Sequence, residues 1–389
     1  MKLSYLNAIV SVLSAVEAFR PASTAGTDKL AAKGLLNLAG YSILHPPKSG
    51  CNLGKVAIRK EWTSLTPRER KNYIKAVLCL QSKPAKSGAL APGARSRFDD
   101  FVATHINQTF SIHATGNFLS WHRYYTFTYE KALREECGYD GYQPYVNWGK
   151  YAEDLEHAPL FDGSDTSMSD NGAYIPQASG PVFPSPVDPT IVLPAGKGSG
   201  CVTSGPFKNL TVNVGPGIFG PQYTDVPLNP QLDGLGYNPR CLRRDLGFQA
   251  ARMASTDLNS TNLITGYTDI VAFQNNMQGT FTSGGNELGV HTAGHFWVGG
   301  DPGGDFSASP GDPFFYLHHA QIDRTWWIWQ NQDLKTRAKA IGGTITILNT
   351  PPSRNATLDD LIDLGVNAPA IKIRDAMSTL DGPFCYIYL

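Results

Sequence analysis

The chain has 389 residues, of which 41% are hydrophobic and 11% aromatic. This composition supplies a core for one large domain or two ordinary ones and excludes a disordered chain. The 33 Lys and Arg residues balance the 33 Asp and Glu residues, so the formal net charge is zero and no nucleic-acid or anionic-membrane partner is indicated.

The first eighteen residues are typical of a secretion signal. Lys2 precedes a short apolar run over 3–16, and Val16-Glu17-Ala18 places small residues as signal peptidase requires. The run is shorter than the ~20 residues that span a bilayer, and no later stretch approaches that length. We predict a secreted protein, cleaved after Ala18, with a single domain over 19–389. A buried N-terminal helix is the alternative.

The cysteines and sequons agree with export. Six cysteines form an even set without a C-x-x-C pair, which favours disulfides over zinc or redox sites, although the sequence does not give their pairing. Four N-x-S/T sequons begin at Asn107, Asn209, Asn259 and Asn355. Together with the leader, these features predict a secreted, disulfide-bonded glycoprotein.

Hydrophobic periodicity predicts several helices along the chain. The first follows the start signal Thr66-Pro67, with Glu69 behind it. The others are expected over about 98–137, with a break near 114–116, over 287–296 and over 313–332. Residues 158–240 differ, because they hold 13 of the 27 prolines and little helical period. We interpret 158–240 as a Pro/Gly-rich loop insertion with short strands, laid over the helices rather than folded alone.

The expected fold class is therefore mainly α. A four-helix-bundle core carries long irregular loops and a few short strands. Neither an internal repeat nor a coiled-coil heptad is found. The sequence does not indicate an oligomeric state.

Histidines fall mainly into two clusters, three within 105–122 and four within 291–319. His291 and His295 are spaced i and i+4, so on a helix both imidazoles project from one face, as a metal clip requires. His122 and His319 lie in aromatic-rich helical segments, where burying an unpaired polar ring would be costly. Metal ligation would remove that cost.

Two groups of three imidazoles, without cysteine or intervening carboxylates, suit copper or zinc better than calcium or magnesium. Metalloprotease chemistry is disfavoured, because the segment His291-Thr292-Ala293-Gly294-His295 lacks the Glu of H-E-x-x-H. A G-x-G-x-x-G match at 215–220 contains Pro216 and is followed by Pro221, which disfavours a dinucleotide site.

Two segments resemble the paired copper signatures of the tyrosinase family. They are His113-Ala-Thr-Gly-Asn-Phe-Leu-Ser-Trp-His122-Arg-Tyr and Asp312-Pro-Phe-Phe-Tyr-Leu-His318-His319-Ala-Gln-Ile-Asp323-Arg324-Thr-Trp326. The resemblance spans roughly 55–388. More narrowly, the chain resembles the short secreted tyrosinase-like and catechol oxidase proteins of filamentous fungi. This resemblance implies two copper ions in a binuclear type-3 site, one held by His105, His113 and His122 and the other by His291, His295 and His319.

The resemblance also implies a reaction. Members oxidise o-diphenols to o-quinones with O2, which leaves as water, and monophenols and o-aminophenols are further candidate substrates. In several relatives a Glu before the second signature and an Asn after its first histidine orient a water for monophenol hydroxylation. Here Glu287 lies four residues before His291, and Thr292 replaces the Asn. We therefore expect diphenol or o-aminophenol oxidation to exceed tyrosine hydroxylation.

Other residues near the motifs receive roles by position. Phe306 stands where some relatives place a gate aromatic over one copper, with ordinary loop packing as the alternative. Asp323, one turn after His319, is expected to hydrogen-bond into the ligand cluster. His318 is expected to be a supporting or structural neighbour. Ser111 stands where some relatives have a cysteine cross-linked to the copper histidine, so His113 is expected to be held less rigidly.

Further expectations concern the rest of the chain. His45 and His157 are expected in exposed loops. Arg59, Tyr386 and Tyr388 resemble the residues that close the family's catalytic core, and no shielding domain is expected to need removal. The alternatives are a reversible O2-binding dicopper protein, a hydrolytic dizinc protein and a catalytically silent family member in pigment or secondary metabolism.

Overall fold

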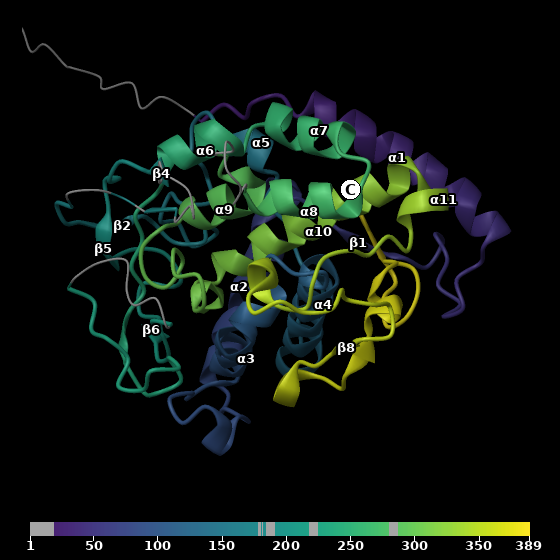
Figure 1. Cartoon of the computed structure of the whole chain (residues 1–389). Helices are drawn as coiled ribbons and strands as arrows, with labels where there is room; N and C mark the ends of the chain where they lie inside the picture. The colour runs from purple at the N-terminus through teal and green to yellow at the C-terminus, as the bar shows by residue number, and fades with distance from the viewer. Residues whose placement is uncertain (1–18, 178–179, 181, 184–190, 218–224, 280–286) are drawn as a thin grey trace, which may run out of the picture.

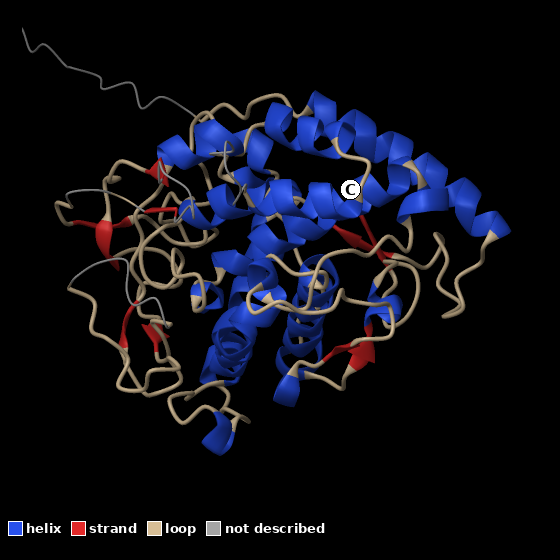
Figure 2. Ribbon diagram, in the orientation of Figure 1, coloured by secondary structure: helices blue, strands red, loops and turns tan. Residues whose placement is uncertain are grey.

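The computed structural model describes residues 19–177, 180, 182–183, 191–217, 225–279 and 287–389. The predicted signal segment, 1–18, lies outside these residues. In the described ranges no helix is both long and apolar enough to cross a membrane. Helices dominate the molecule, and the strands are few and short (Figure 2), which confirms the mainly α class predicted from the sequence.

The core contains the four helices that carry the histidine clusters. They are α3 (Arg97–Ile112), α4 (Phe118–Cys137), α9 (Gly289–Phe296) and α10 (Phe314–Gln332). Every residue of α10 from 314 to 331 is buried, so this helix is the central element. Figure 1 shows α3 and α4 beside each other, with α9 and α10 across their upper ends.

Local capping explains where the predicted helices begin. The Thr66 hydroxyl accepts the Glu69 amide, and the Glu69 carboxylate accepts the Thr66 amide, so a capping box starts α2 (Pro67–Ser82). Ser96 and Asp99 form the same arrangement at α3. The predicted break between α3 and α4 is present, and Ala114 there has a φ of 47°.

Several helices were not predicted from the sequence. They are α1 (Ala25–Leu44), α5 (Trp148–Tyr151), α6 (Phe248–Ala254), α7 (Asp257–Gly266), α8 (Ile270–Gln278) and α11 (Leu334–Arg337). A long-range contact fixes α1: the Asp257 carboxylate accepts hydrogen bonds from the Gly26 and Thr27 amides. Because Leu36 and Ile43 of α1 remain exposed, its sequence has no clean apolar face.

The strands form two-stranded pairs. Antiparallel pairs join β2 (Gly172–Tyr174) to β5 (Ser199–Val202), β3 (Val182–Phe183) to β4 (Ile191–Val192), β6 (Thr211–Val212) to β7 (Arg240–Cys241) and β8 (Leu361–Ile362) to β9 (Ile371–Lys372). A parallel pair joins β1 (Ala57–Arg59) to β10 (Tyr386–Tyr388). Strands β2–β7 belong to the region predicted as an insertion, which lies to the left of the helices in Figure 1.

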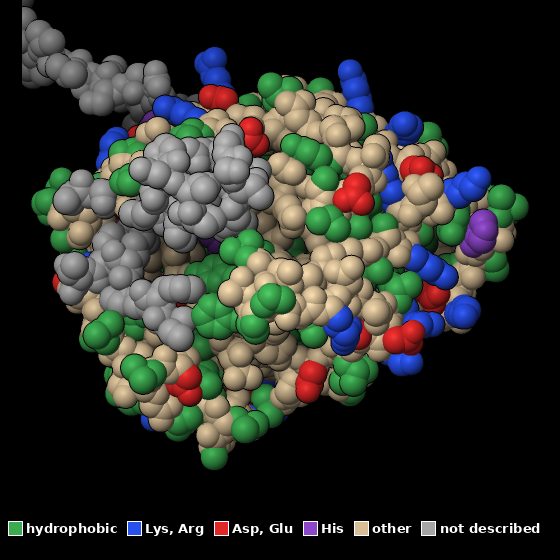
Figure 3. All heavy atoms as spheres, in the orientation of Figure 1, with side chains coloured by type: hydrophobic (Ala, Val, Ile, Leu, Met, Phe, Trp, Pro, Cys, Tyr) green, Lys and Arg blue, Asp and Glu red, His purple; other side chains and the backbone are tan. Residues whose placement is uncertain are grey.

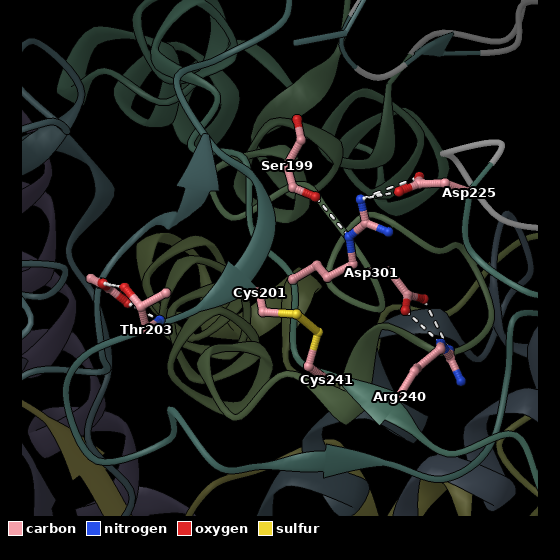
Figure 4. Close-up of a disulfide and its surroundings, with 9 residues drawn as sticks. Ser199, Cys201, Thr203, Asp225, Arg240, Cys241 and Asp301 are labelled. Carbon is pink, nitrogen blue, oxygen red and sulfur yellow. Dashed lines mark hydrogen bonds and ion pairs between the residues drawn. A yellow bond between two sulfur atoms is a disulfide. The ribbon is translucent and has the colours of Figure 1, made fainter. Parts of the chain in front are cut away.

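Three disulfides join all six cysteines: Cys51–Cys385, Cys79–Cys137 and Cys201–Cys241. The predicted use of cysteine in disulfides is therefore confirmed. The first joins the segment before β1 to the residue before β10. The third joins β5 to β7, beside an ion pair between Arg240 and Asp301 (Figure 4).

Candidate metal centre

The first histidine cluster comes from α3 and α4. His105 lies within α3, His113 is the residue that caps its end, and His122 lies within α4. All three side chains are buried. Each Nδ1 lies within hydrogen-bond distance of a backbone carbonyl oxygen: those of Ser307 at 2.6 Å, Thr109 at 2.9 Å and Phe118 at 2.8 Å, respectively.

These contacts fix the tautomers. A carbonyl oxygen only accepts, so Nδ1 carries the proton in each neutral ring and Nε2 keeps its lone pair. The Nε2 atoms of His105 and His122 are buried and have no hydrogen-bond partner among the described residues, although one ligand atom from each of the three rings lies within 4.8 Å of the others. Buried nitrogen lone pairs that converge without a donor are the arrangement that a metal ion satisfies.

The second cluster is formed by α9 and α10. Nε2 of His295 lies 3.1 Å from Nε2 of His291 and 3.2 Å from Nε2 of His319. In a tetrahedral site with metal–nitrogen bonds of about 2.0–2.1 Å, neighbouring ligand nitrogens are about 3.3 Å apart. The observed spacing therefore fits three nitrogens around one ion, and the predicted i, i+4 relationship of His291 and His295 places both rings together.

His318 is the fourth histidine of this cluster. Its Nδ1 accepts a hydrogen bond of 3.1 Å from the indole nitrogen of Trp148 in α5. The ring packs so closely against α9 that a Cβ added at Gly294 would lie 2.1 Å from it. The structure thus explains the glycine between His291 and His295, which sequence reasoning did not interpret.

The two clusters face each other. The ring centroids of His122 and His319 are 4.6 Å apart, and those of His113 and His291 are 6.0 Å apart. Burial lowers the pKa of His113 to about 4, and burial together with neighbouring His113 lowers the pKa of His295 to about 3. The pKa values of the remaining cluster histidines are also lowered, mainly by burial. Near pH 7 all the rings are therefore neutral, which is the form that binds metal.

One loop, 299–312, contacts both clusters. The Ser307 carbonyl accepts from His105, and the backbone of Gly303 hydrogen-bonds His295. The Asp305 carboxylate accepts the amides of Gly217, Ser307 and Ala308, which fixes the loop's fold. Burial raises the pKa of this carboxyl. The sequence gives no local sign of these contacts.

Buried ion pairs anchor this loop to β7 and the residues after it. Arg240 binds Asp301 through two nitrogens, at 2.5 and 2.9 Å, and Arg244 binds Asp312 through two nitrogens, both at 2.7 Å. Figure 4 shows the Arg240–Asp301 pair near the disulfide that holds β7. The Asp312 carboxylate also accepts the Phe314 amide at the start of α10, so the loop and the ligand helix share one anchor.

Three residues predicted near the substrate lie at different depths. The Phe306 ring is partly exposed, with its centroid 4.6 Å from that of His113. Thr292 is half-buried, and its hydroxyl donates a 2.5 Å hydrogen bond to the Gln278 carbonyl. Glu287 is exposed, two residues before α9.

The predicted role of Asp323 needs correction. Its carboxylate does not bond an imidazole among the described residues. It accepts instead from Arg123 at 2.6 Å, Tyr386 at 2.5 Å, Tyr388 at 2.6 Å and Arg59 at 3.4 Å. A fully buried carboxylate needs compensating charge, and two guanidinium groups supply it. Asp323 therefore joins α4, α10, β1 and β10 rather than orienting a ligand ring.

The remaining histidines lie apart from the clusters. His45 is exposed at the end of α1, and its ring stacks on Tyr41. His157 is exposed and pairs with Asp154. Both positions are as predicted. On the face drawn in Figure 3, Lys and Arg side chains are interspersed with Asp and Glu, in keeping with the balanced net charge.

The chain is similar in sequence and in fold to known proteins. The family described as the common central domain of tyrosinase matches residues 95–332. Tyrosinase-like protein orsC of Emericella nidulans is 44% identical over 314 residues, covering 78% of this chain and 82% of the relative. N-acetyl-6-hydroxytryptophan oxidase ivoB of the same species is 40% identical over 351 residues, covering 87% of this chain and 93% of the relative.

A solved structure extends the similarity to three dimensions. The structure of a single-residue variant of polyphenol oxidase from Thermothelomyces thermophila is 44% identical in sequence, with a TM-score of 0.86. The match covers 95% of this chain and 98% of the other. The family match over 95–332 contains both histidine clusters.

Proposed function

Because this chain belongs to the tyrosinase family and is a type-3 copper oxidoreductase with a binuclear copper site, we propose that it is a polyphenol oxidase that converts o-diphenols to o-quinones. The observation that carries the proposal is the convergence of two triads of neutral, buried imidazoles on facing helices. Bound copper supplies reversible electron transfer to O2. The protein supplies ligand geometry, a dry site and controlled access.

The proposed ligands are six Nε2 atoms. One copper is assigned to His105, His113 and His122, and the other to His291, His295 and His319. The backbone hydrogen bonds at Nδ1 support the first triad, and the 3.1 and 3.2 Å spacings of Nε2 atoms support the second. Neutral nitrogen ligands without carboxylates suit copper and disfavour a hydrolytic dizinc centre.

The overall reaction balances as two diphenols to one O2. Each diphenol loses two electrons and two protons, and O2 takes up four of each to give two waters. Phe306 is assigned to substrate access, because its ring lies over His113 and is partly exposed. An aromatic ring at this position offers a stacking surface to a phenol.

Diphenols are proposed to be better substrates than tyrosine-type monophenols. Monophenol hydroxylation needs a base that removes the phenolic proton. The Thr292 hydroxyl already donates its proton to the Gln278 carbonyl, so it can only accept from a water. Glu287 is exposed, where bulk water competes for its carboxylate. Both features support low hydroxylase activity.

Two further substrate classes follow from chemistry and from similarity. o-Aminophenols lose two electrons and two protons in the same way as diphenols. One relative at 40% identity is named for oxidation of N-acetyl-6-hydroxytryptophan, so a hydroxyindole belongs in the substrate panel. We also propose secretion after cleavage at Ala18, since disulfides persist in oxidising compartments.

Oxygen uptake by the copper-loaded protein tests the proposal. The panel is 4-tert-butylcatechol, 2-aminophenol, tyramine and 6-hydroxyindole. We expect rapid uptake with 4-tert-butylcatechol and slower uptake, after a lag, with tyramine. Faster turnover of tyramine without a lag would contradict the substrate order. Copper binding without uptake on any substrate would instead favour an oxygen carrier or a silent family member.

A further inference from the structure

Gln278, the last residue of α8, contacts the segments that carry a histidine of each triad. Its side-chain oxygen accepts the Ala114 amide at 2.8 Å, next to His113. Its backbone carbonyl accepts the Thr292 hydroxyl at 2.5 Å, next to His291. One buried residue thus bridges two segments whose histidine rings face each other across the centre, 6.0 Å apart.

The first contact, between the Gln278 side chain and the Ala114 amide, stabilises an unfavourable backbone conformation at Ala114. Ala114 has a φ of 47°, in the left-handed region, where a residue with a Cβ is strained by about 1–2 kcal/mol. The strain persists because both polar groups of Ala114 are bonded: its amide to Gln278, and its carbonyl to the Leu348 amide at 3.3 Å. Without the Gln278 acceptor, this turn would relax toward ordinary φ values and move His113 with it.

His113 depends on this turn more than the other ligands of its triad do. His105 and His122 lie inside helices, whereas His113 follows the last residue of α3 and has an extended backbone conformation. Ser111, two residues earlier, directs its hydroxyl to the Gln108 carbonyl and gives the ring no support. The backbone that follows His113 is therefore held at Ala114, by its bonds to Gln278 and Leu348.

The second contact is equally well supported. The Gln278 amide nitrogen donates to the Gln274 carbonyl at 3.1 Å, which fixes the orientation of the side chain. Helix α9 approaches α8 so closely that a Cβ on Gly289 would lie 2.5 Å from the Met277 carbonyl oxygen. Gln278 is thus a rigid point against which both α9 and the His113 turn are placed.

We propose that Gln278 is a positioning residue that sets His113 relative to His291 and so holds both copper ions at their working separation. The inference rests on the proposed ligand assignment. Gln278 acts through two hydrogen bonds. Its side-chain oxygen fixes the turn after His113, and its backbone carbonyl fixes the helix turn after His291. Removing the side chain weakens copper retention in the His113 triad first, because the backbone carbonyl of the second contact remains.

The test compares copper retention by purified, fully loaded protein challenged with a chelator. Gln278→Met keeps the side-chain volume and removes the acceptor. We expect one of the two coppers per chain to leave about 10–100-fold faster than in wild type, the range typical of losing an outer hydrogen-bond partner of a ligand. Gln278→Glu retains an acceptor for the Ala114 amide but loses the donor to the Gln274 carbonyl, so its copper loss should fall between those of wild type and Gln278→Met.

Gln143→Met is the matched control. Gln143 is another buried glutamine, bonded to Tyr73 and the Pro144 carbonyl and apart from both triads. It should lower the thermal stability of the copper-free protein without speeding copper loss. Equal copper loss from Gln278→Met and wild type, or from Gln278→Met and Gln143→Met, would overturn the inference.

Thr292→Val removes only the second contact. This nearly isosteric change at a half-buried site keeps the test available if Gln278→Met does not fold. This variant should lose the copper held by the His291 triad faster than wild type does. If it retains copper as well as wild type, Gln278 does not position the two triads. Failure of wild type to take up two coppers would overturn the proposed function, and this inference with it.

Discussion

The indole nitrogen of Trp148 donates a hydrogen bond of 3.1 Å to Nδ1 of His318. Because an indole N–H only donates, Nδ1 of the neutral ring holds a lone pair and the proton resides on Nε2. Neither nitrogen of His318 is then free for a metal. The next residue, His319, instead directs Nε2 toward Nε2 of His295 at 3.2 Å. Adjacent histidines of one motif therefore have different roles.

Replacing each of these two histidines in turn should show which one binds copper and which one only stabilises the fold. His319→Ala removes one proposed ligand and should leave about one copper per chain, with oxidase activity lost. His318→Gln keeps an acceptor for Trp148 and should retain both coppers with lower thermal stability. The measurement is copper per chain by elemental analysis. Loss of copper from His318→Gln but not from His319→Ala would reverse the assignment.

Acid should destabilise the copper-free protein over a defined range. The pKa of His113 falls from 6.5 to about 4, mainly through burial, and that of His295 falls to about 3. Between pH 6.5 and about 4, the unfolded chain binds protons that the folded chain does not, so folding stability decreases as pH falls. Denaturant unfolding of the copper-free protein at pH 7, 5.5 and 4.5 measures this.

Copper loading provides the control for the acid effect. Copper occupies the lone pairs that protons would take, so the loaded protein should lose less stability than the copper-free protein as pH falls from 7. A free energy of unfolding that is flat from pH 7 to 4.5 in the copper-free protein would show that the rings are not buried neutral groups.

Asp323→Asn should weaken the fold more than it weakens copper binding. The substitution removes the carboxylate that pairs with buried Arg123, which typically costs about 3–5 kcal/mol, whereas Arg59 keeps its pair with Glu130. Burial alone would raise the pKa of Asp323, but Arg123 and Arg59 lower it below 3.8 overall. Its stabilisation is thus present above about pH 4, the usual unfolded pKa, and is lost as pH falls further.

Urea unfolding at pH 7 measures the effect of Asp323→Asn. The matched control is Asp359→Asn, which removes an exposed carboxylate paired with Lys372 and Arg374. Exposed pairs contribute little, so this variant should unfold like wild type. Equal unfolding of the two variants would contradict the structural role assigned to Asp323.

Phe306→Ala should alter which phenols are preferred. The Phe306 ring lies over His113 and is 37% exposed, so its removal widens access above the first triad. The ratio of kcat/KM for 4-tert-butylcatechol to that for unsubstituted catechol should rise several-fold. Tyr174→Ala, an exposed aromatic in β2, is the control. An unchanged ratio in Phe306→Ala would show that Phe306 only packs within its loop and does not control substrate access.

The helices that carry the metal ligands could be predicted because their signals are local. The spacing of His291 and His295 places two rings on one face of α9, and aromatic-rich helical periodicity surrounds His122 and His319. The paired histidine motifs then specify the centre. In contrast, α1 spreads its apolar residues around its surface and depends on Asp257, more than 200 residues away.

The supporting contacts could not be predicted because they join distant parts of the chain. Gln278 and Ala114 are 164 positions apart, and His105 and Ser307 are 202 apart. Asp323 shows how local reasoning fails: its spacing from His319 suggested a contact with the ligands. Its carboxylate is directed instead to Arg123 and other long-range partners, because a buried charge binds where opposite charge is available.

Stepwise copper loading during oxygen uptake tests the central claim most directly. Metal-free protein is titrated with copper, and uptake with 4-tert-butylcatechol is recorded against copper per chain. The two facing triads predict that activity requires both ions, reaches its maximum at two coppers per chain and is absent from zinc-loaded protein. Full activity at one copper per chain, or equal activity with zinc, would contradict a binuclear copper oxidase.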